Sequence, residues 1–123
     1  MKIKKDLRVL VVDDDLAIMQ LQAAALTVVG CSVFTAAGPI EALNAIAAAG
    51  RRMFDIAVLD YQMPVMNGSL LASCLRLMNS DLKIILYSGS VDIPQSDVAR
   101  ADAYVCKSEG PHKLINTMTS LTS

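Results

Sequence analysis

Two short apolar runs, Val9–Val12 (VLVV) and Ile56–Leu59 (IAVL), are each followed directly by aspartate. The first leads into Asp13-Asp14-Asp15 and the second into Asp60. Short runs rich in β-branched residues are typical of strands buried on both faces of a parallel sheet. All strands of such a sheet point the same way, so both acidic ends are expected at one carboxyl edge, where open α/β sheets bind their ligands.

Carboxylates gathered at one edge of a sheet repel one another unless a cation lies between them. Oxygen atoms are the ligands that Mg²⁺ prefers in proteins. A single aspartate after a strand is more often a solvated loop residue than a ligand. Two strands that both end at aspartate favour a cation site instead.

The composition is that of one globular domain. The chain has 123 residues, 54% of them hydrophobic and 19% charged, which excludes a disordered chain. Its net charge of −1 gives no basic field, so we expect no direct nucleic-acid partner. The apolar runs fall short of the roughly 20 residues that a membrane span needs, and the first residues do not form a signal peptide. Three widely spaced cysteines indicate free thiols in a reducing compartment, so we expect a cytoplasmic protein. From the length and the apolar runs we expect a single domain over residues 1–123, without a membrane partner.

Short apolar runs alternate with longer helical patterns along the whole chain. Asp15 and Gly38-Pro39 are placed to begin helices, and Gly30 and Gly50 are placed to end them. Five strand–helix units joined by right-handed crossovers predict a doubly wound, five-stranded parallel sheet of the α/β class. The expected strands cover 8–12, 32–35, 55–59, 83–87 and 103–106, and the expected helices cover 16–29, 39–50, 69–78, 95–100 and 111–121.

The expected strand ends bring together the parts that phosphoryl transfer needs. The first strand supplies an acidic pair that can hold a divalent cation, and the third supplies Asp60 as a nucleophile. The fourth and fifth strands end at Ser88 and Lys107, whose hydroxyl and ammonium groups can bind the oxygens of a phosphoryl group. Mg²⁺ would let Asp60 approach a phosphate by cancelling their repulsion.

Four segments together resemble the receiver domain of two-component response regulators, and the resemblance covers nearly the whole chain. Val11-Val12-Asp13-Asp14 is similar to the acidic pair after the family's first strand. Residues 59–68 (LDYQMPVMNG) match every fixed position of its phosphoacceptor motif, Asp-x-x-Met-Pro-x-Met-x-Gly. Tyr87-Ser88-Gly89 matches the family's Ser or Thr that is followed by a small residue. Residues 101–107 match the family's aromatic residue three positions before its lysine, here Tyr104 and Lys107. The resemblance implies the flavodoxin-like (βα)5 receiver fold.

Carried over by position, the resemblance implies that Asp60 is phosphorylated by a histidine kinase or a histidine phosphotransfer protein. Asp14 and Asp60 would bind Mg²⁺ directly, together with the backbone carbonyl of Gln62. Asp13 would act on the metal mainly through water. The chain would catalyse only its own phosphorylation and dephosphorylation, and is not expected to be a turnover enzyme.

The resemblance also implies a conformational switch. Ser88 and Lys107 would bind the phosphoryl oxygens, and Tyr104 would turn inward when Ser88 moves toward the phosphate. Gln62 and Ser90 would flank the path of the attacking water and tune the lifetime of the phosphate. The response would reach a downstream protein or effector domain, and none is expected in this chain because it ends soon after the last helix.

Two features depart from the family pattern. Lys107 is followed by Ser108, where receivers usually carry proline in a cis bond. A cis bond before serine costs about 2.5–4 kcal/mol, so we expect a trans bond that aims Lys107 differently. Ser88 and Lys107 are 19 positions apart, which is roughly three fewer than is common in receivers, or just under one helical turn. The shortening falls in the fourth helix, so we expect a partner surface unlike that of a typical dimerising regulator.

Other function classes remain open. A degenerate receiver would bind proteins independently of phosphate, and both departures are compatible with it. A phosphohydrolase with an aspartate nucleophile and Mg²⁺, similar to the haloacid-dehalogenase phosphatases, would show Asp-x-Asp-x-Thr/Val after the first strand. Residues 13–17 (DDDLA) supply only the first part of that pattern. A flavodoxin-like cofactor domain is disfavoured, because the first loop carries acids where a phosphate-binding loop would offer glycines.

Overall fold

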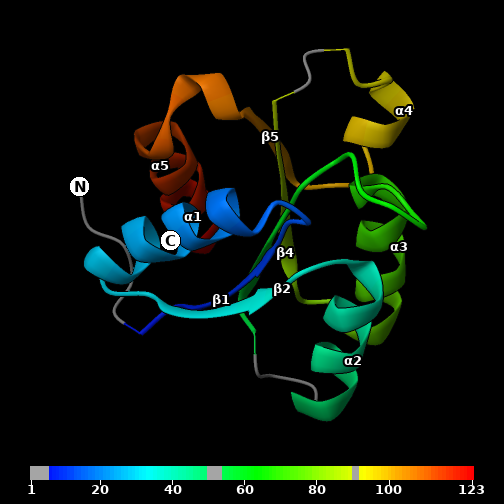
Figure 1. The fold of residues 1–123 in the computed structure, drawn as a ribbon, viewed down its shortest axis with the longest axis horizontal. Helices are drawn as coiled ribbons and strands as arrows, with labels where there is room; N and C mark the ends of the chain where they lie inside the picture. Colours follow the sequence, from blue (N-terminus) through cyan, green and yellow to red (C-terminus); the bar gives the residue numbers. More distant parts are fainter. Residues whose placement is uncertain (1–5, 50–53, 90–91) are drawn as a thin grey trace.

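The structure, a computed structural model, describes residues 6–49, 54–89 and 92–123. These residues form a five-stranded parallel sheet with the strand order β2-β1-β3-β4-β5 (Figure 1). The predicted doubly wound α/β sheet is therefore confirmed. The strands are β1 (Arg8–Val12), β2 (Ser32–Ala36), β3 (Ile56–Leu59), β4 (Lys83–Ser88) and β5 (Ala103–Cys106).

Helices cover both faces of this sheet. Figure 1 shows α1 and α5 together on one face, with α2, α3 and α4 on the other. No helix in the described ranges is long and apolar enough to cross a bilayer. The helices are α1 (Leu16–Val28), α2 (Pro39–Ala49), α3 (Gly68–Met78), α4 (Gln95–Val98) and α5 (Pro111–Thr122), and a 3₁₀ turn, η1 (Lys107–Glu109), joins β5 to α5.

The central strands are continuous apolar runs because both of their faces are buried. In β1, Val9 and Val11 belong to a buried cluster that includes side chains of α1 and α5. Leu10 and Val12 belong to a second cluster, which includes side chains of α2 and α3. Every residue of β3 is buried as well. This is the two-sided burial expected of a parallel sheet between two helix layers.

The first turns of α1 and α3 are fixed by side-chain caps. Asp15 accepts hydrogen bonds from the backbone N–H groups of Ala17 and Ile18, at 3.1 and 3.2 Å, which confirms its predicted role as a helix cap. Asn67 accepts from the backbone N–H of Leu70 at 2.9 Å in the same way. These caps set where each helix leaves the carboxyl edge of the sheet.

α4 is shorter than the predicted helix over 95–100. After Val98 the chain makes tight turns, in which Arg100 N donates to the carbonyl of Asp97 at 3.2 Å and Ala101 N to that of Val98 at 3.1 Å. Gly50, predicted to end the second helix, lies outside the described residues.

The short α4 is tied to the loop that follows β3. The Tyr61 hydroxyl donates a hydrogen bond to the Asp97 carboxylate. The Ser69 hydroxyl donates to the Asp97 carbonyl at 3.2 Å. One residue of α4 therefore holds this helix against the segment that begins directly after Asp60.

Val65 has an unusual backbone conformation for its residue type. Its φ angle is +77°, in the left-handed region that β-branched residues avoid because of steric crowding. The side chain is 81% exposed, so little packing compensates for this conformation. The turn between β3 and α3 therefore stores local strain at Val65.

We predict that Val65→Asn raises the free energy of unfolding by about 1 kcal/mol, because asparagine tolerates the left-handed region far better than valine. Urea unfolding of both proteins measures the difference. The control is Val28→Asn, at a similarly exposed valine that is the last residue of α1 and has an ordinary, negative φ angle, so it should bring no such gain. An unchanged or lowered stability of the Val65 variant would contradict the prediction.

Candidate functional site

The parallel register places the two acidic strand ends side by side. β1 and β3 are adjacent, with Val12 level with Leu59, so Asp13 and Asp60 leave the sheet at the same height. The Asp60 N–H donates to the carbonyl of Val12 at 2.9 Å, which fixes this alignment. The strand order reverses between β1 and β3, and this switch point is where doubly wound sheets bind ligands.

Three carboxylates converge at this point. Oxygen atoms of Asp13, Asp14 and Asp60 lie within 4.8 Å of one another. Asp14 is exposed, whereas the Asp13 side chain is only 1% exposed. An all-oxygen donor set with one face open to solvent fits a hard divalent cation such as Mg²⁺, which retains several waters.

Lys107 reaches into this cluster from the end of β5. Its Nζ atom lies 2.7 Å from Asp13 Oδ2 and 3.4 Å from Asp60 Oδ1. The bond between Lys107 and Ser108 is trans, as predicted. With this trans bond the Lys107 ammonium still contacts both acids, and a different aim from that of receivers with a cis proline bond stays a prediction.

The turn η1 explains how Lys107 reaches the acids without a following proline. The carboxylate of Glu109 accepts a hydrogen bond from the Cys106 backbone N–H at 3.1 Å, which closes the turn around the lysine. The Ser108 hydroxyl lies 3.1 Å from Cys106 Sγ. These contacts fix the backbone at the root of the lysine side chain.

The electrostatics of the site favour an added cation. Burial raises the pKa of the Asp60 carboxyl, and the Asp13 and Asp14 charges raise it further, while Lys107 acts in the opposite direction. Burial alone would lower the pKa of Lys107, but its hydrogen bond with Asp13 and the charge of Asp60 outweigh burial and raise it. The cluster therefore holds three acids against one ammonium.

The Asp13 carboxylate already has partners on both oxygens. Oδ1 accepts from the backbone N–H of Asp15 at 2.9 Å. Oδ2 accepts from Lys107 and, at 3.3 Å, from the side-chain amide of Gln22 on α1. This arrangement is compatible with the predicted action of Asp13 through water rather than as a direct ligand.

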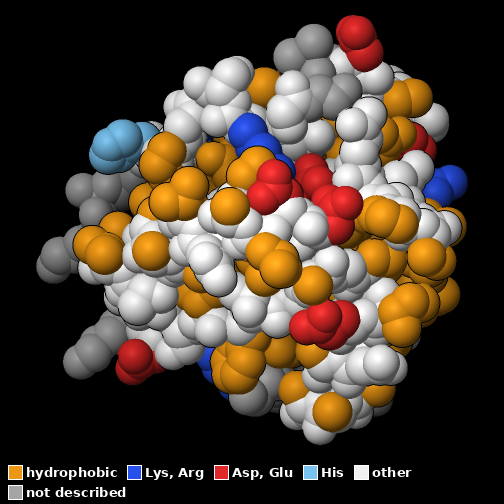
Figure 2. Space-filling model, viewed as in Figure 1, with side chains coloured by type: hydrophobic (Ala, Val, Ile, Leu, Met, Phe, Trp, Pro, Cys, Tyr) orange, Lys and Arg blue, Asp and Glu red, His pale blue; other side chains and the backbone are white. Residues whose placement is uncertain are grey.

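An open hollow of about 670 Å³ surrounds these groups, and Figure 2 shows acidic side chains gathered at the loop before α1. Ser88 and the exposed Gln62 line the hollow as predicted, together with Lys107. Tyr104 does not line it but packs, half-buried, against the cluster on the α2 and α3 face. Ser90 lies outside the described residues. The structure therefore brings together all the described candidate residues except Tyr104.

Two further residues belong to the site although the sequence did not single them out. Gly68 lies so close to Asp60 that a Cβ atom on it would be 2.2 Å from the carbonyl oxygen of Asp60. The fixed glycine in the motif was the available signal for this contact. Gln22 lies on α1 and belongs to none of the motifs in the sequence. Its contact with Asp13 is therefore seen only in the folded chain.

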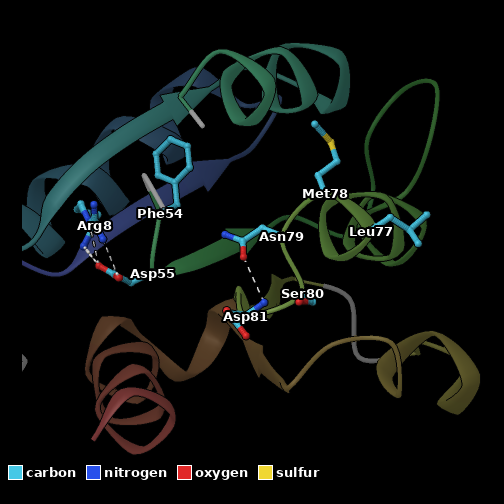
Figure 3. Close-up of a pocket in the computed structure, with 8 residues that line it drawn as sticks. All are labelled: Arg8, Phe54, Asp55, Leu77, Met78, Asn79, Ser80 and Asp81. Carbon is cyan, nitrogen blue, oxygen red and sulfur yellow. Dashed lines mark hydrogen bonds and ion pairs between the residues drawn. The ribbon is translucent and has the colours of Figure 1, made fainter. Parts of the chain in front are cut away.

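A second hollow, of about 430 Å³, lies at the opposite, amino edge of the sheet (Figure 3). Arg8 and Asp55 pair on one of its walls, with a distance of 3.2 Å between Nη2 and Oδ1, and Phe54 lies beside them. Leu77 and Asp81 line the other side. No candidate site residue lines it.

The fold and the site together define a class of protein: a (βα)5 domain with an acidic cluster and a lysine at its switch point. The family model of the response regulator receiver domain matches residues 9–119. The chain belongs to this receiver-domain family. The resemblance seen in the sequence is confirmed.

Curated relatives are response regulators. The transcriptional regulatory protein PrrA of Mycobacterium tuberculosis is 37% identical over 103 residues, which are 81% of this chain and 43% of PrrA. The response regulator MprA of a Mycobacterium species is 32% identical over 117 residues, which are 93% of this chain and 50% of MprA. The chain thus spans about half the length of these relatives.

Solved structures agree with this family. The response regulator TrrA of Thermotoga maritima, in complex with Mg²⁺-BeF, is 31% identical and has a TM-score of 0.85, covering 98% of this chain and 99% of that one. A chain in the complex of the histidine kinase ThkA with TrrA matches with 32% identity and a TM-score of 0.83, covering all of this chain and all of the matched chain.

We predict that Asp60→Asn stabilises the metal-free protein at pH 7. The folded-state pKa of Asp60 is raised, so ionising this group costs folding free energy once the pH exceeds that pKa. The gain in the free energy of unfolding should shrink as the pH falls through the folded-state pKa of Asp60. It should vanish below the ordinary aspartate pKa, where Asp60 is protonated in both the folded and the unfolded protein. Urea unfolding in EDTA across this range measures it.

The matched control is Asp81→Asn, an exposed aspartate at the amino edge of the sheet. Because this side chain is exposed, the variant should leave the free energy of unfolding at pH 7 close to that of the wild type. An Asp60 variant less stable than wild type at pH 7 would show that the lysine contact dominates the carboxylate repulsion.

Proposed function

We propose that this receiver domain accepts a phosphoryl group on Asp60 and uses it to change its protein contacts. The observation that carries the proposal is the convergence of three carboxylates and Lys107 around one open hollow. The similar protein TrrA binds Mg²⁺ and beryllofluoride, a mimic of an acyl phosphate, which supports the same chemistry for this chain.

Asp14 and Asp60, with the backbone carbonyl of Gln62, would hold Mg²⁺, and Asp13 would bind its water shell. The ion would neutralise the charge that Asp60 and the phosphoryl group share. This division of roles is supported by the burial of Asp13, whose oxygens are already bonded, and by the exposure of Asp14 and Gln62.

In the reaction, an Asp60 oxygen attacks the phosphorus of a phosphohistidine. A P–O bond forms, the P–N bond breaks, and its electron pair returns to the imidazole of the donor. The Lys107 ammonium would bind the negatively charged phosphoryl oxygens. To do so, it would move away from Asp13. Water later hydrolyses the aspartyl phosphate to inorganic phosphate, with Gln62 and Ser90 flanking its path and tuning the rate.

The output would be a shift between two conformations. Ser88, at the carboxyl end of β4, would bind a phosphoryl oxygen, and Tyr104 on neighbouring β5 would turn inward. Because Tyr104 is only half-buried, its side chain can still move inward. A ligand that binds one conformation better shifts the population toward it. The chain would act on itself only, as a signalling component and not as a turnover enzyme.

The phosphate-dependent reading is favoured over a degenerate receiver because Lys107 reaches both acids through the trans loop. The curated relatives are about twice as long as this chain. We therefore propose that the signal passes to an effector domain or a separate protein, rather than to nucleic acid bound by this chain.

The phosphodonor would be a histidine kinase or a phosphotransfer protein that docks on α1. This helix has no charged residue, and Leu16 and Leu21 are exposed on it. An apolar hollow of about 270 Å³ between α1 and α5 shares Ile18 and Lys107 with the acidic hollow, so a partner seated there would cover Asp60. Figure 2 shows hydrophobic side chains beside the acidic group. The kinase complex of TrrA supports a partner of this class.

We predict that beryllofluoride changes the amide NMR spectrum of the protein only when Mg²⁺ is present. The changed signals should include Ser88, Tyr104 and Lys107, because the mimic occupies the phosphoryl position. Asp60→Asn, which keeps the size of the side chain, should abolish the response. A folded wild-type protein that gives no response would support the phosphate-independent binding module.

We also predict that Leu21→Glu lowers the rate of phosphotransfer from a histidine kinase at least about tenfold, because it buries a charge in an apolar interface. Labelling by acetyl phosphate should not change, since a small donor needs no docking surface. Leu77→Glu is the control: Leu77 is 89% exposed on α3, against 73% for Leu21 on α1. Equal losses in both variants would exclude α1 as the docking surface.

A further inference from the structure

The buried carboxylate of Asp13 shares one oxygen between two donors of different kinds. The Lys107 ammonium lies 2.7 Å from Oδ2, and the Gln22 side-chain nitrogen lies 3.3 Å from the same atom. The shorter contact is charge-assisted and dominates. The longer one lies just beyond the usual range of about 2.7–3.2 Å for an N–H···O hydrogen bond, so the amide makes a secondary contact here.

Phosphorylation would remove the dominant donor. In the proposed function Lys107 moves to a phosphoryl oxygen, and Oδ2 of Asp13 then loses its ammonium partner. A carboxylate that is 1% exposed cannot turn to bulk water for a replacement, and an unsatisfied buried acceptor costs stability. In the phosphorylated state this oxygen is left with the waters of the metal and the Gln22 amide as its donors.

We propose that Gln22 is a positioning residue that holds Asp13 when Lys107 transfers to the phosphoryl group. This inference rests on the proposed function and deepens it. The Gln22 amide shortens its bond with Oδ2 as the lysine leaves, and so keeps Asp13 directed at the waters of the metal. Gln22 touches neither the metal nor the phosphoryl group and acts through Asp13 alone.

A neutral donor suits this position. A lysine or arginine at residue 22 would place a permanent positive charge beside Asp13 and would compete with Mg²⁺ for the cluster. The glutamine amide donates a hydrogen bond without changing the net charge of the site. Its helix is held by the Asp15 cap, so the amide is presented to Asp13 from a fixed backbone.

The test compares Gln22→Met, which keeps the length of the side chain and removes the donor, with Gln20→Met. Gln20 is exposed on the same helix and serves as the matched control. Beryllofluoride is titrated at saturating Mg²⁺ and followed by amide NMR. Gln22→Met should bind it about fivefold more weakly than wild type, the effect of one ordinary hydrogen bond, and Gln20→Met should not differ from wild type.

Two further measurements separate this role from a general structural one. The side-chain amide signals of Gln22 should move downfield when beryllofluoride binds to the wild type, because the bond with Asp13 shortens. The urea midpoint of free Gln22→Met should match the wild type, since Lys107 still pairs with Asp13 in that state.

The outcomes are distinct. Equal beryllofluoride affinity for Gln22→Met and wild type, an unmoved Gln22 amide, or an affinity loss matched by a loss of stability in the free protein would each overturn the inference. The first two would leave the phosphoacceptor function standing. A wild-type protein that does not bind beryllofluoride would overturn both.

Discussion

Repulsion between aspartates at one edge of the sheet is the constraint on which this molecule depends. Parallel pairing of β1 and β3 forces Asp13 and Asp60 to the same height, and Asp14 follows directly. Lys107, delivered by the edge strand β5, offsets only part of that repulsion. The site is thus prepared for additional positive charge, and the fold tolerates the cost because both sides of the sheet are packed.

The same few elements serve several purposes at once. α1 begins at the cap of Asp15, packs one core through Met19 and Leu26, and carries Gln22 to the acidic cluster. The loop after β3 begins with Asp60, and its next residue, Tyr61, holds α4 through a hydrogen bond to Asp97. Single hydrogen bonds therefore connect the acidic hollow, or the residue next to Asp60, to both helix layers.

Much of this architecture could be predicted from the sequence, because strands buried on both faces must be continuous apolar runs and the acids must follow them. Asp13, Asp60, Ser88 and Lys107 could be placed at one edge for the same reason. The contact of Lys107 with both acids through a trans turn depends on Glu109, which closes that turn and which no pattern in the sequence reveals. The contact of Gln22 with Asp13 escaped prediction because it joins a helix to a strand end at atomic range. The length of α4 was overestimated because tight turns after Val98 replace helix.

The absence of charge on α1 also has a kinetic meaning. Salt screens attractions between exposed charges over about 8–10 Å, and steering by such charges accelerates the encounter of protein partners. A helix whose exposed face is built from residues such as Leu16 and Leu21 receives no such acceleration from its own side chains. Recognition through it would depend on shape and on water release, and would be nearly indifferent to ionic strength. A partner contact made through this apolar face alone would therefore keep its strength over a wide range of salt concentrations.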